Sequence, residues 1–258
     1  MPESDLEMMQ GTKTIGIIGG MGPAATVDLF DLIVENTQAA CDQEHIHILI
    51  DNNPAIPDRT EAILHGTASP VKELCASAER LASAGADFLI IACNTAHYYI
   101  GQIREKVSIP VLDMIEETAL YVRKAGFRSA VILCTEGARK TGIFTERFEK
   151  HGVNVIYPDH DLQTEVNRIV YDGVKGGKQE YDTTRFQHAL HQVVKETGAV
   201  PVLGCTELPI AQKKYHLQGE YINPSYVLAC SAISEAGYRR KEQPDLKCGN
   251  GSRGRTGA

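Results

Sequence analysis

Two short segments carry the residues best suited to chemistry. One reads A-C-N-T-A-H and contains Cys93, and the other reads G-C-T-E-L-P and contains Cys205. An apolar run precedes each cysteine, at 88–91 and at 200–203. Such runs predict buried strands, and a strand that ends at a cysteine delivers the thiol to the carboxyl edge of a sheet, where α/β proteins bind ligands. Two thiols delivered in this way indicate an acid and a base that face one substrate.

Proton transfer at carbon is the chemistry that suits two thiols. A thiol has a reference pKa of about 8.5 and can serve as base or acid near neutral pH. If one cysteine is a thiolate and the other a thiol, one takes a proton from one face of a carbon and the other returns a proton to the opposite face. Asn94, Thr95 and Thr206 follow the cysteines and can donate hydrogen bonds to a thiolate or a substrate. Helices that begin after each cysteine would favour a thiolate and a bound carboxylate at their N-termini.

The rest of the chain alternates apolar runs with amphipathic stretches, which predicts alternating strands and helices. The expected strands are 14–19, 45–50, 88–92, 110–113, 129–134, 153–157, 200–203 and 221–223. The expected helices are 24–40, 69–84, 95–106, 115–125, 140–150, 162–174, 183–196 and 224–239. The buried face of the first helix is expected to consist of Val27, Phe30, Ile33 and Val34.

Two landmarks recur at a similar spacing, which indicates an internal repeat. Cys93 and Cys205 are 112 residues apart, and the turn at Gly19-Gly20 precedes the strand end at Cys134-Thr135 by about 115 residues. Alternating strands and helices give each half a parallel sheet with right-handed crossovers. The predicted fold is therefore α/β, with two pseudo-symmetric domains, each a parallel sheet flanked by helices, and with the active site in the cleft between them.

The repeat also predicts where the domains begin and end. An N-terminal domain is expected at 14–115 and a C-terminal domain at 116–223, with the helix over 224–240 packing back on the first domain. Residues 241–258 contain few apolar side chains and are expected to lack stable structure.

The composition excludes several classes of protein. The formal net charge of −7 argues against a general affinity for nucleic acid, and no apolar stretch approaches the roughly 20 residues of a membrane helix. The acidic N-terminus lacks the pattern of a signal peptide, so a cytoplasmic location is expected. The seven cysteines include no C-x-x-C pair, which argues against a structural zinc site and, in a reducing compartment, against disulfides.

Four segments together resemble the signatures of the aspartate/glutamate racemase superfamily, most closely its aspartate racemase branch. They are the G-G-M-G-P turn after the first strand, P-D-R-T in a loop expected at 57–60, A-C-N-T at 92–95 and G-C-T-E at 204–207. The resemblance spans roughly residues 14–240. It implies a two-base racemase that needs no cofactor and no metal, has two pseudo-symmetric α/β domains and forms a homodimer. Both cysteines are retained, so racemisation in both directions is expected.

The resemblance also assigns residues to the substrate. It places Met21 of the glycine turn in the pocket and gives Thr135 a pocket hydroxyl. It also makes Arg59 a ligand of the side-chain carboxylate of the substrate, and Lys175 a ligand of a substrate carboxylate. Arginine is suited to this role on chemical grounds as well. An acidic protein needs a local cation to hold an anion, and a guanidinium can do so with two parallel hydrogen bonds.

Three other features allow competing interpretations. The turn at 19–23 lacks the G-K-[ST] ending and the G-x-G-x-x-G spacing of nucleotide sites, which argues against a phosphate loop. His97 can contact the first thiol or satisfy a local backbone group, and Glu207 can tune the second thiol or cap the following segment. Cys134 directly precedes a pocket position and is interpreted as packing within the sheet.

The sequence thus predicts a racemase of aspartate, or of glutamate, which is longer by one methylene. A second hypothesis is a related isomerase or decarboxylase on the same scaffold, such as a maleate isomerase, a hydantoin racemase or an arylmalonate decarboxylase. A third is a non-catalytic relative that binds a ligand in the cleft. The two carboxylate ligands favour the first hypothesis. Nothing in the sequence decides which cysteine is ionised at rest.

Overall fold

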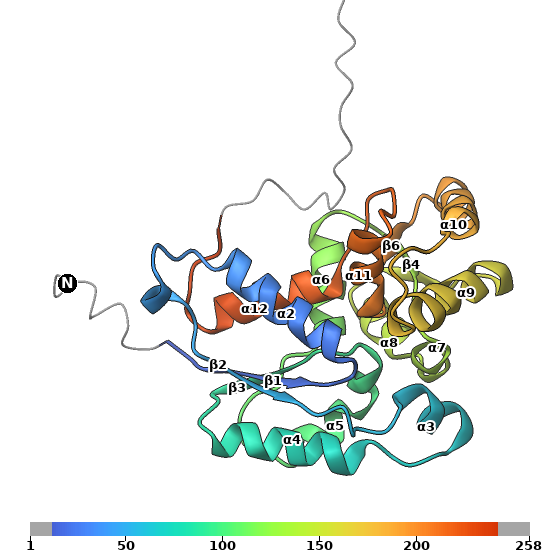
Figure 1. Cartoon of the computed structure of the whole chain (residues 1–258). Coiled ribbons are helices and arrows are strands. Elements are labelled where there is room, and N and C mark those ends of the chain that lie inside the picture. Colours follow the sequence, from blue (N-terminus) through green and yellow to red (C-terminus); the bar gives the residue numbers. More distant parts are fainter. Residues whose placement is uncertain (1–11, 242–258) are drawn as a thin grey trace, which may run out of the picture.

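A computed structural model describes residues 12–241 of the chain. Two small parallel sheets flanked by helices occupy adjoining halves of the molecule (Figure 1). The prediction of an α/β protein with two such halves is confirmed, while the domain boundaries stay a prediction. Apart from Lys241, the tail expected at 241–258 lies outside the described residues.

Both sheets have the same strand order, which agrees with an internal repeat. In spatial order, the first sheet consists of β2 (Ile48–Asn52), β1 (Ile15–Gly19) and β3 (Phe88–Ile91). The second consists of β5 (Asn154–Ile156), β4 (Ser129–Ile132) and β6 (Val200–Val202). The expected strands at 110–113 and 221–223 are reduced to single bridges, from Val111 to Leu89 and from Ile222 to Val202.

Helices surround both sheets. Those of the first half are α2 (Pro23–Asn36), α3 (Arg59–His65), α4 (Val71–Ser83) and α5 (Ile100–Arg104), with the 3₁₀ helices η1 (Asp42–Glu44) and η2 (Thr95–Tyr99). Those of the second half are α7 (Glu136–Thr141), α8 (Ile143–Lys150), α9 (His160–Asn167), α10 (Thr184–Thr197) and α11 (Glu207–Lys214), with the π-helix η3 (Arg168–Lys175). Helix α6 (Met114–Lys124) connects the halves, and α12 (Pro224–Glu235) comes last.

Three of these helices depart from the prediction. Helix α3 begins at Arg59, inside the segment expected to be a loop, because the Asp58 carboxylate accepts hydrogen bonds from two backbone N–H groups of its first turn. The helix expected at 162–174 changes into a π-helix at Arg168 and continues to Lys175. Helix α11 follows Cys205, where a helix was expected but its bounds were not predicted.

The predicted buried face of α2 is wrong in part. Val27 and Phe30 are 66% and 39% exposed, whereas Leu29 is fully buried. The turn before the helix explains the rotation, since Thr26 Oγ1 accepts a hydrogen bond from the backbone N–H of Gly20 at 2.9 Å. This bond directs the face that contains Thr26 and Leu29 toward the sheet and turns Val27 and Phe30 outward.

Helix α12 packs against α2 and α6, so the end of the described chain lies beside its beginning (Figure 1). Leu228, Ala229 and Ile233 belong to the same buried cluster as Ile15 of β1 and Leu29 of α2. Hydrophobic burial therefore holds the last helix on the first sheet.

A buried histidine fixes the chain after β3. His97 Nδ1 lies 2.9 Å from the carbonyl oxygen of Cys93, and His97 Nε2 accepts a hydrogen bond from the backbone N–H of Met114 at 3.1 Å. An acceptor at Nε2 places the proton of a neutral ring on Nδ1, and burial lowers the pKa of His97, which also favours the neutral form. His97 thus bonds backbone groups and ties the Cys93 turn to the start of α6.

An ion pair connects the start of α6 to the second half. One Asp113 carboxylate oxygen accepts hydrogen bonds from the first turn of α6, and the other lies 2.7 Å from Arg147 Nε of α8. Both side chains are largely buried, at 8% and 13% exposure. Burial raises the pKa of Asp113, whereas His97 and Arg147 lower it, and the net direction is downward. The Asp113 carboxylate is therefore held in its charged form.

Arg147→Met should lower the free energy of unfolding by about 3 kcal/mol, because it leaves a buried carboxylate without its cation. Urea denaturation at pH 7 measures this loss. Lys150→Met is the control, since the Lys150 pair with Glu116 is 65% exposed on the lysine side and should contribute less than about 1 kcal/mol.

The folded state lowers the pKa of Asp113, so the stabilisation is complete above the unfolded pKa of about 3.9 and disappears as the pH falls through the folded value. A difference between wild type and Arg147→Met that is the same at neutral and strongly acidic pH would contradict this account.

Helices α3 and α7 bring the two halves into direct contact. A Cβ placed on Gly137 of α7 would lie 2.9 Å from Thr60 Cα and 3.0 Å from Thr60 Oγ1 of α3. Atoms that are not bonded do not pack so closely in a protein interior, so only glycine allows the two helices to approach to this distance.

Gly137→Ala should force α3 and α7 apart and destabilise the protein by about 1–3 kcal/mol through overpacking. Thermal unfolding followed by circular dichroism measures the effect. Gly101→Ala in α5 is the matched control, because nothing lies within 4 Å of its Cβ position and alanine is the better helix former there. If Gly137→Ala melts at or above the temperature of Gly101→Ala, the halves are not in close contact at this point.

Candidate active site

The nine residues assigned to the site from the sequence all line one narrow cavity. They are Met21, Arg59, Cys93, Asn94, Thr95, Thr135, Lys175, Cys205 and Thr206. The lining is completed by Asp58, Thr60, Tyr171 and Glu207. The structure therefore brings the predicted set together, and the roles of its members stay predictions.

The repeat explains why these residues meet. Met21 and Cys93 follow the ends of β1 and β3, and Thr135 and Cys205 follow the ends of β4 and β6, which hold the same places in the second sheet. The carboxyl edges of the two sheets thus face one cavity, and each sheet contributes one thiol. Cys93 and Cys205 are 5% and 6% exposed.

Arg59 is a buried cation held in place by backbone carbonyls. Its guanidinium donates hydrogen bonds to the carbonyl oxygens of Met21, Ile56 and Pro57 at 3.0 to 3.3 Å. Its Nε has no hydrogen-bond partner among the described residues. Burial lowers the pKa of Arg59, whereas the interactions with Cys93, Asp58 and Glu207 raise it, and the net direction is upward. Arg59 therefore offers a fixed, charged donor to an anion in the cavity.

Asn94 is the least satisfied side chain of the cavity. It is 1% exposed, and neither its amide oxygen nor its amide nitrogen has a hydrogen-bond partner among the described residues. Buried polar atoms without partners are rare in folded proteins. An amino acid can satisfy both atoms, because its ammonium group donates to an amide oxygen and its carboxylate accepts from an amide nitrogen.

The second thiol lies beside a carboxylate and an ammonium group. Cys205 Sγ is 3.0 Å from Glu207 Oε2, and Lys175 Nζ is 3.6 Å from Glu207 Oε1. Burial lowers the pKa of Lys175, whereas Glu207 and Cys205 raise it, with a net rise, so Lys175 stays charged. The sequence allowed Glu207 either to tune the second thiol or to cap the following segment. Its short distance to Cys205 Sγ favours the tuning of the Cys205 thiol.

Tyr171 is a lining residue that the sequence interpretation missed. It lies in the π-helix η3, and Lys175 Nζ sits 5.1 Å from the centre of its ring. The only signal in the sequence is its position four residues before Lys175, which places both side chains on one side of a helix. A π-helical turn is hard to recognise in a sequence, and such turns often occur at functional sites.

A hydrogen bond joins the two halves across the cavity. Thr95 Oγ1 and Thr135 Oγ1 are 3.0 Å apart, and Thr135 also caps the N-terminus of α7. The cavity has a volume of about 10 Å³, enough for about one water molecule. The walls must therefore separate before a larger ligand can enter.

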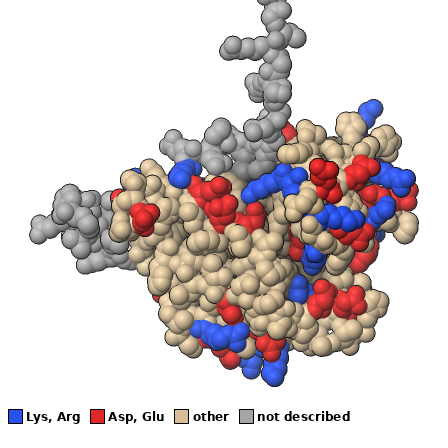
Figure 2. Space-filling view, viewed as in Figure 1, with Lys and Arg blue, Asp and Glu red and all other residues tan. Residues whose placement is uncertain are grey.

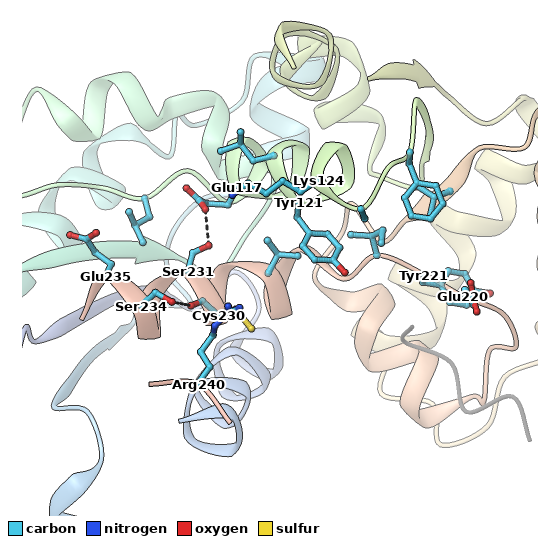
Figure 3. A pocket seen from close by; sticks show the side chains of 17 residues that line it. Glu117, Tyr121, Lys124, Glu220, Tyr221, Cys230, Ser231, Ser234, Glu235 and Arg240 are labelled. Carbon is cyan, nitrogen blue, oxygen red and sulfur yellow. Dashed lines mark hydrogen bonds between the residues drawn. The ribbon is translucent and has the colours of Figure 1, made fainter. Parts of the chain in front are cut away.

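A much larger hollow of the described chain lies elsewhere. It measures about 900 Å³ and is bordered by α6 and α12, where Ser231 donates a hydrogen bond to Glu117 at 2.7 Å (Figure 3). None of the predicted site residues lines it. Cavity volume alone would therefore select a hollow that contains neither of the two thiols. The chemistry of the lining side chains instead selects the smaller cavity as the candidate site.

Other kinds of site find no support in residues 12–241. No three histidine, cysteine, aspartate or glutamate side chains in this range are placed to hold a metal ion. No helix of this part of the chain has both the length and the apolar character needed to span a membrane. On the face shown in Figure 2, lysine and arginine side chains are interspersed with acidic ones, so that face carries no continuous basic patch.

Known proteins share this fold and sequence pattern. An aspartate racemase from Picrophilus torridus has 32% sequence identity and a TM-score of 0.74, over 89% of this chain and 96% of that one. The broad specificity amino-acid racemase RacX from Bacillus subtilis (strain 168) is 29% identical over 226 residues, which are 85% of this chain and 96% of the relative. A glutamate racemase from Francisella tularensis, solved with D-glutamate, shares the fold with a TM-score of 0.61 at 17% identity, over 90% of this chain and 85% of that one.

The family profile described as Asp/Glu/hydantoin racemase matches residues 18–228, which include all nine predicted site residues. The match spans both sheets and the cavity between them, and so agrees with the fold and with the motifs around the two cysteines. The chain therefore belongs to the Asp/Glu/hydantoin racemase family, and it is an amino-acid racemase by its family and its relatives.

Proposed function

We propose that the protein interconverts L- and D-aspartate, with Cys93 and Cys205 as the two proton-transfer groups and without pyridoxal phosphate or a metal ion. The observation that carries the proposal is one thiol from each sheet in a single narrow cavity that Arg59 and Lys175 also line. The aspartate racemase among the similar structures supports the choice of substrate.

The polar groups of the cavity suit a dicarboxylic amino acid. Arg59 and Lys175 are separate cations, so each can take one carboxylate, and the unpartnered Arg59 Nε provides a donor that no described residue uses. The amide of Asn94 can accept from the substrate ammonium group and donate to a carboxylate. A monocarboxylic substrate would leave Arg59 or Lys175 without a substrate carboxylate.

The reaction conserves protons. One cysteine thiolate takes the α-proton and becomes a thiol, while the electron pair of the C–H bond stays on carbon. The other thiol then donates its proton to the opposite face and becomes a thiolate. The α-proton is far less acidic than a thiol, so the site must stabilise the developing negative charge with fixed donors in a cavity that excludes water. Arg59, Lys175 and the small cavity volume meet these requirements.

The cysteine pair is tested by alanine substitution in heavy water. Cys93→Ala and Cys205→Ala should each reduce racemisation of aspartate about a thousandfold or more, since each removes one proton-transfer group. Each variant should retain, at most, α-deuterium incorporation into one enantiomer. Chiral chromatography and mass spectrometry follow the two processes.

Cys134→Ala is the matched control, because Cys134 also follows a strand but is fully buried outside the cavity. It should keep most of the activity. Normal racemisation by Cys93→Ala would refute the two-base scheme. Wild-type protein that leaves the α-proton of aspartate in place would instead favour a ligand-binding relative or an enzyme that acts on another carboxylate.

The preference for a dicarboxylic substrate is tested at Arg59. Arg59→Lys should lower kcat/KM for aspartate about 100-fold, because an ammonium cannot replace a guanidinium that bonds three carbonyls and an anion at once. Activity toward alanine, which lacks the second carboxylate, should fall much less. Arg80→Lys is the control, since Arg80 pairs with Asp51 at the surface. Equal losses for aspartate and alanine would contradict the carboxylate role, and a wild type that prefers alanine would favour a broader specificity.

A further inference from the structure

Glu207 has an unusual position for a carboxylate. It is the first residue of α11 and is 4% exposed. Its Oε2 lies 3.0 Å from Cys205 Sγ and 3.3 Å from Thr206 Oγ1, and its Oε1 lies 3.6 Å from Lys175 Nζ. Every polar contact of this carboxylate is therefore with a residue that lines the cavity.

The contact with Cys205 requires a proton. A carboxylate oxygen and a thiolate are both acceptors, so a separation of 3.0 Å is favourable only if Cys205 is the S–H donor and Glu207 the acceptor. Lys175 contacts the other carboxylate oxygen and so stabilises the charged form of Glu207. The proton is therefore placed on the sulfur rather than on the carboxylate.

Cys93 lies in a different electrostatic environment. It lines the cavity together with Arg59, and the interaction between them contributes to the raised pKa of the guanidinium, which is fixed by three backbone carbonyls. A guanidinium stabilises a thiolate and has no lone pair that could accept a thiol proton. The two thiols occupy equivalent places in the repeat, yet one faces a cation and the other an anion.

We propose that Glu207 sets the resting state of the two cysteines by keeping the proton on Cys205, so that the free protein holds a Cys205 thiol and a Cys93 thiolate. This assignment rests on the proposed function, and Glu207 acts in it as a positioning residue through Cys205. For the enantiomer whose α-hydrogen faces Cys93, Cys93 removes the α-proton and Cys205 supplies the proton that replaces it. After that turnover Cys93 is the thiol and Cys205 the thiolate, which is the form that reacts with the opposite enantiomer. The resting state returns when one proton leaves Cys93 for water and another reaches Cys205.

The other charged and titratable groups of the cavity fit this assignment. Burial and Glu207 raise the pKa of Cys205 well above its ordinary value, while Lys175 from η3 lowers it. Tyr171 of η3 stays neutral, because burial raises its pKa. In the first half, the Asp58 carboxylate accepts hydrogen bonds from backbone N–H groups of α3. Arg59, also in the first half, has a pKa that the interaction with Cys93 helps to raise. Among these groups, Glu207 is the anion bonded to Cys205.

Alkylation of the free protein tests the resting state without reference to catalysis. Iodoacetamide is applied over a range of pH, and peptide mass spectrometry records the modification of each cysteine. Cys93 should react at lower pH than Cys205, although the two are equally buried. Glu207→Gln should shift the profile of Cys205 to lower pH by about one unit or more and leave that of Cys93 in place. Glu207→Asp, which keeps the charge, should restore part of the difference.

Kinetics provide the second measurement. The high-pH limb of kcat/KM reports loss of the Cys205 proton in the free enzyme, so Glu207→Gln should move it to lower pH. The shift should be the same from L- and D-aspartate, because the equilibrium constant of a racemisation is one. Glu136→Gln is the matched control, since Glu136 is the first residue of α7 and lies outside the cavity lining. It should change neither profile.

The outcomes separate this assignment from the proposed function. Wild-type Cys205 that is alkylated at lower pH than Cys93 overturns the assignment, and so does a folded Glu207→Gln protein with the wild-type profile. The wild-type order of reaction tests the assignment even if the variant does not fold. The protein could also be alkylated in the expected order, with Cys93 reacting at lower pH than Cys205, and yet leave aspartate unchanged. This result would support the assignment and refute the proposed function.

Discussion

The site depends on the close contact between the two halves of the molecule. Gly137 lets α7 approach α3, and the hydroxyls of Thr95 and Thr135 bond across the same boundary. This contact encloses the strand ends of two separate sheets in a cavity with room for about one water molecule. Charges act strongly only where water is excluded. With a wider gap, the same side chains would be solvated groups on two unrelated sheet edges.

Several side chains inside this cavity lower the stability of the folded protein. Arg59 Nε and both amide atoms of Asn94 are buried without partners among the described residues, and such atoms destabilise a folded chain. A carboxylate, Glu207, is buried beside a thiol. The surrounding backbone compensates in part, since three carbonyls hold the Arg59 guanidinium. Groups that lower the stability of an otherwise well-packed fold are typical of functional sites, where they are needed for binding or catalysis.

Much of the fold could be predicted from the sequence, because strand and helix periodicity is local information. The errors arise where a tertiary contact overrides it. The bond from Gly20 to Thr26 rotates α2 and exposes Val27, and the Asp58 cap starts α3 at Arg59 inside an expected loop. The π-helix that holds Lys175 has no clear sequence signal, since π-helical turns are rare and occur mostly as short interruptions of α-helices.

The sequence by itself determined the inventory of the site: two thiols at strand ends, the small polar residues after them, and two cations. Spacing along the chain indicates the two thiols, because equivalent positions of a repeat reach equivalent sheet edges, whereas the resemblance to the racemase superfamily implies the cations. Only the tertiary structure decided what surrounds each sulfur. Cys93 shares its part of the cavity with Arg59 and contributes to the raised pKa of that guanidinium, whereas Cys205 bonds the carboxylate of Glu207. The two cysteine motifs are nearly symmetric in the sequence, yet their thiols lie in different electrostatic environments. The protonation of a thiol depends on the charged groups near it in space and not on its position in the chain.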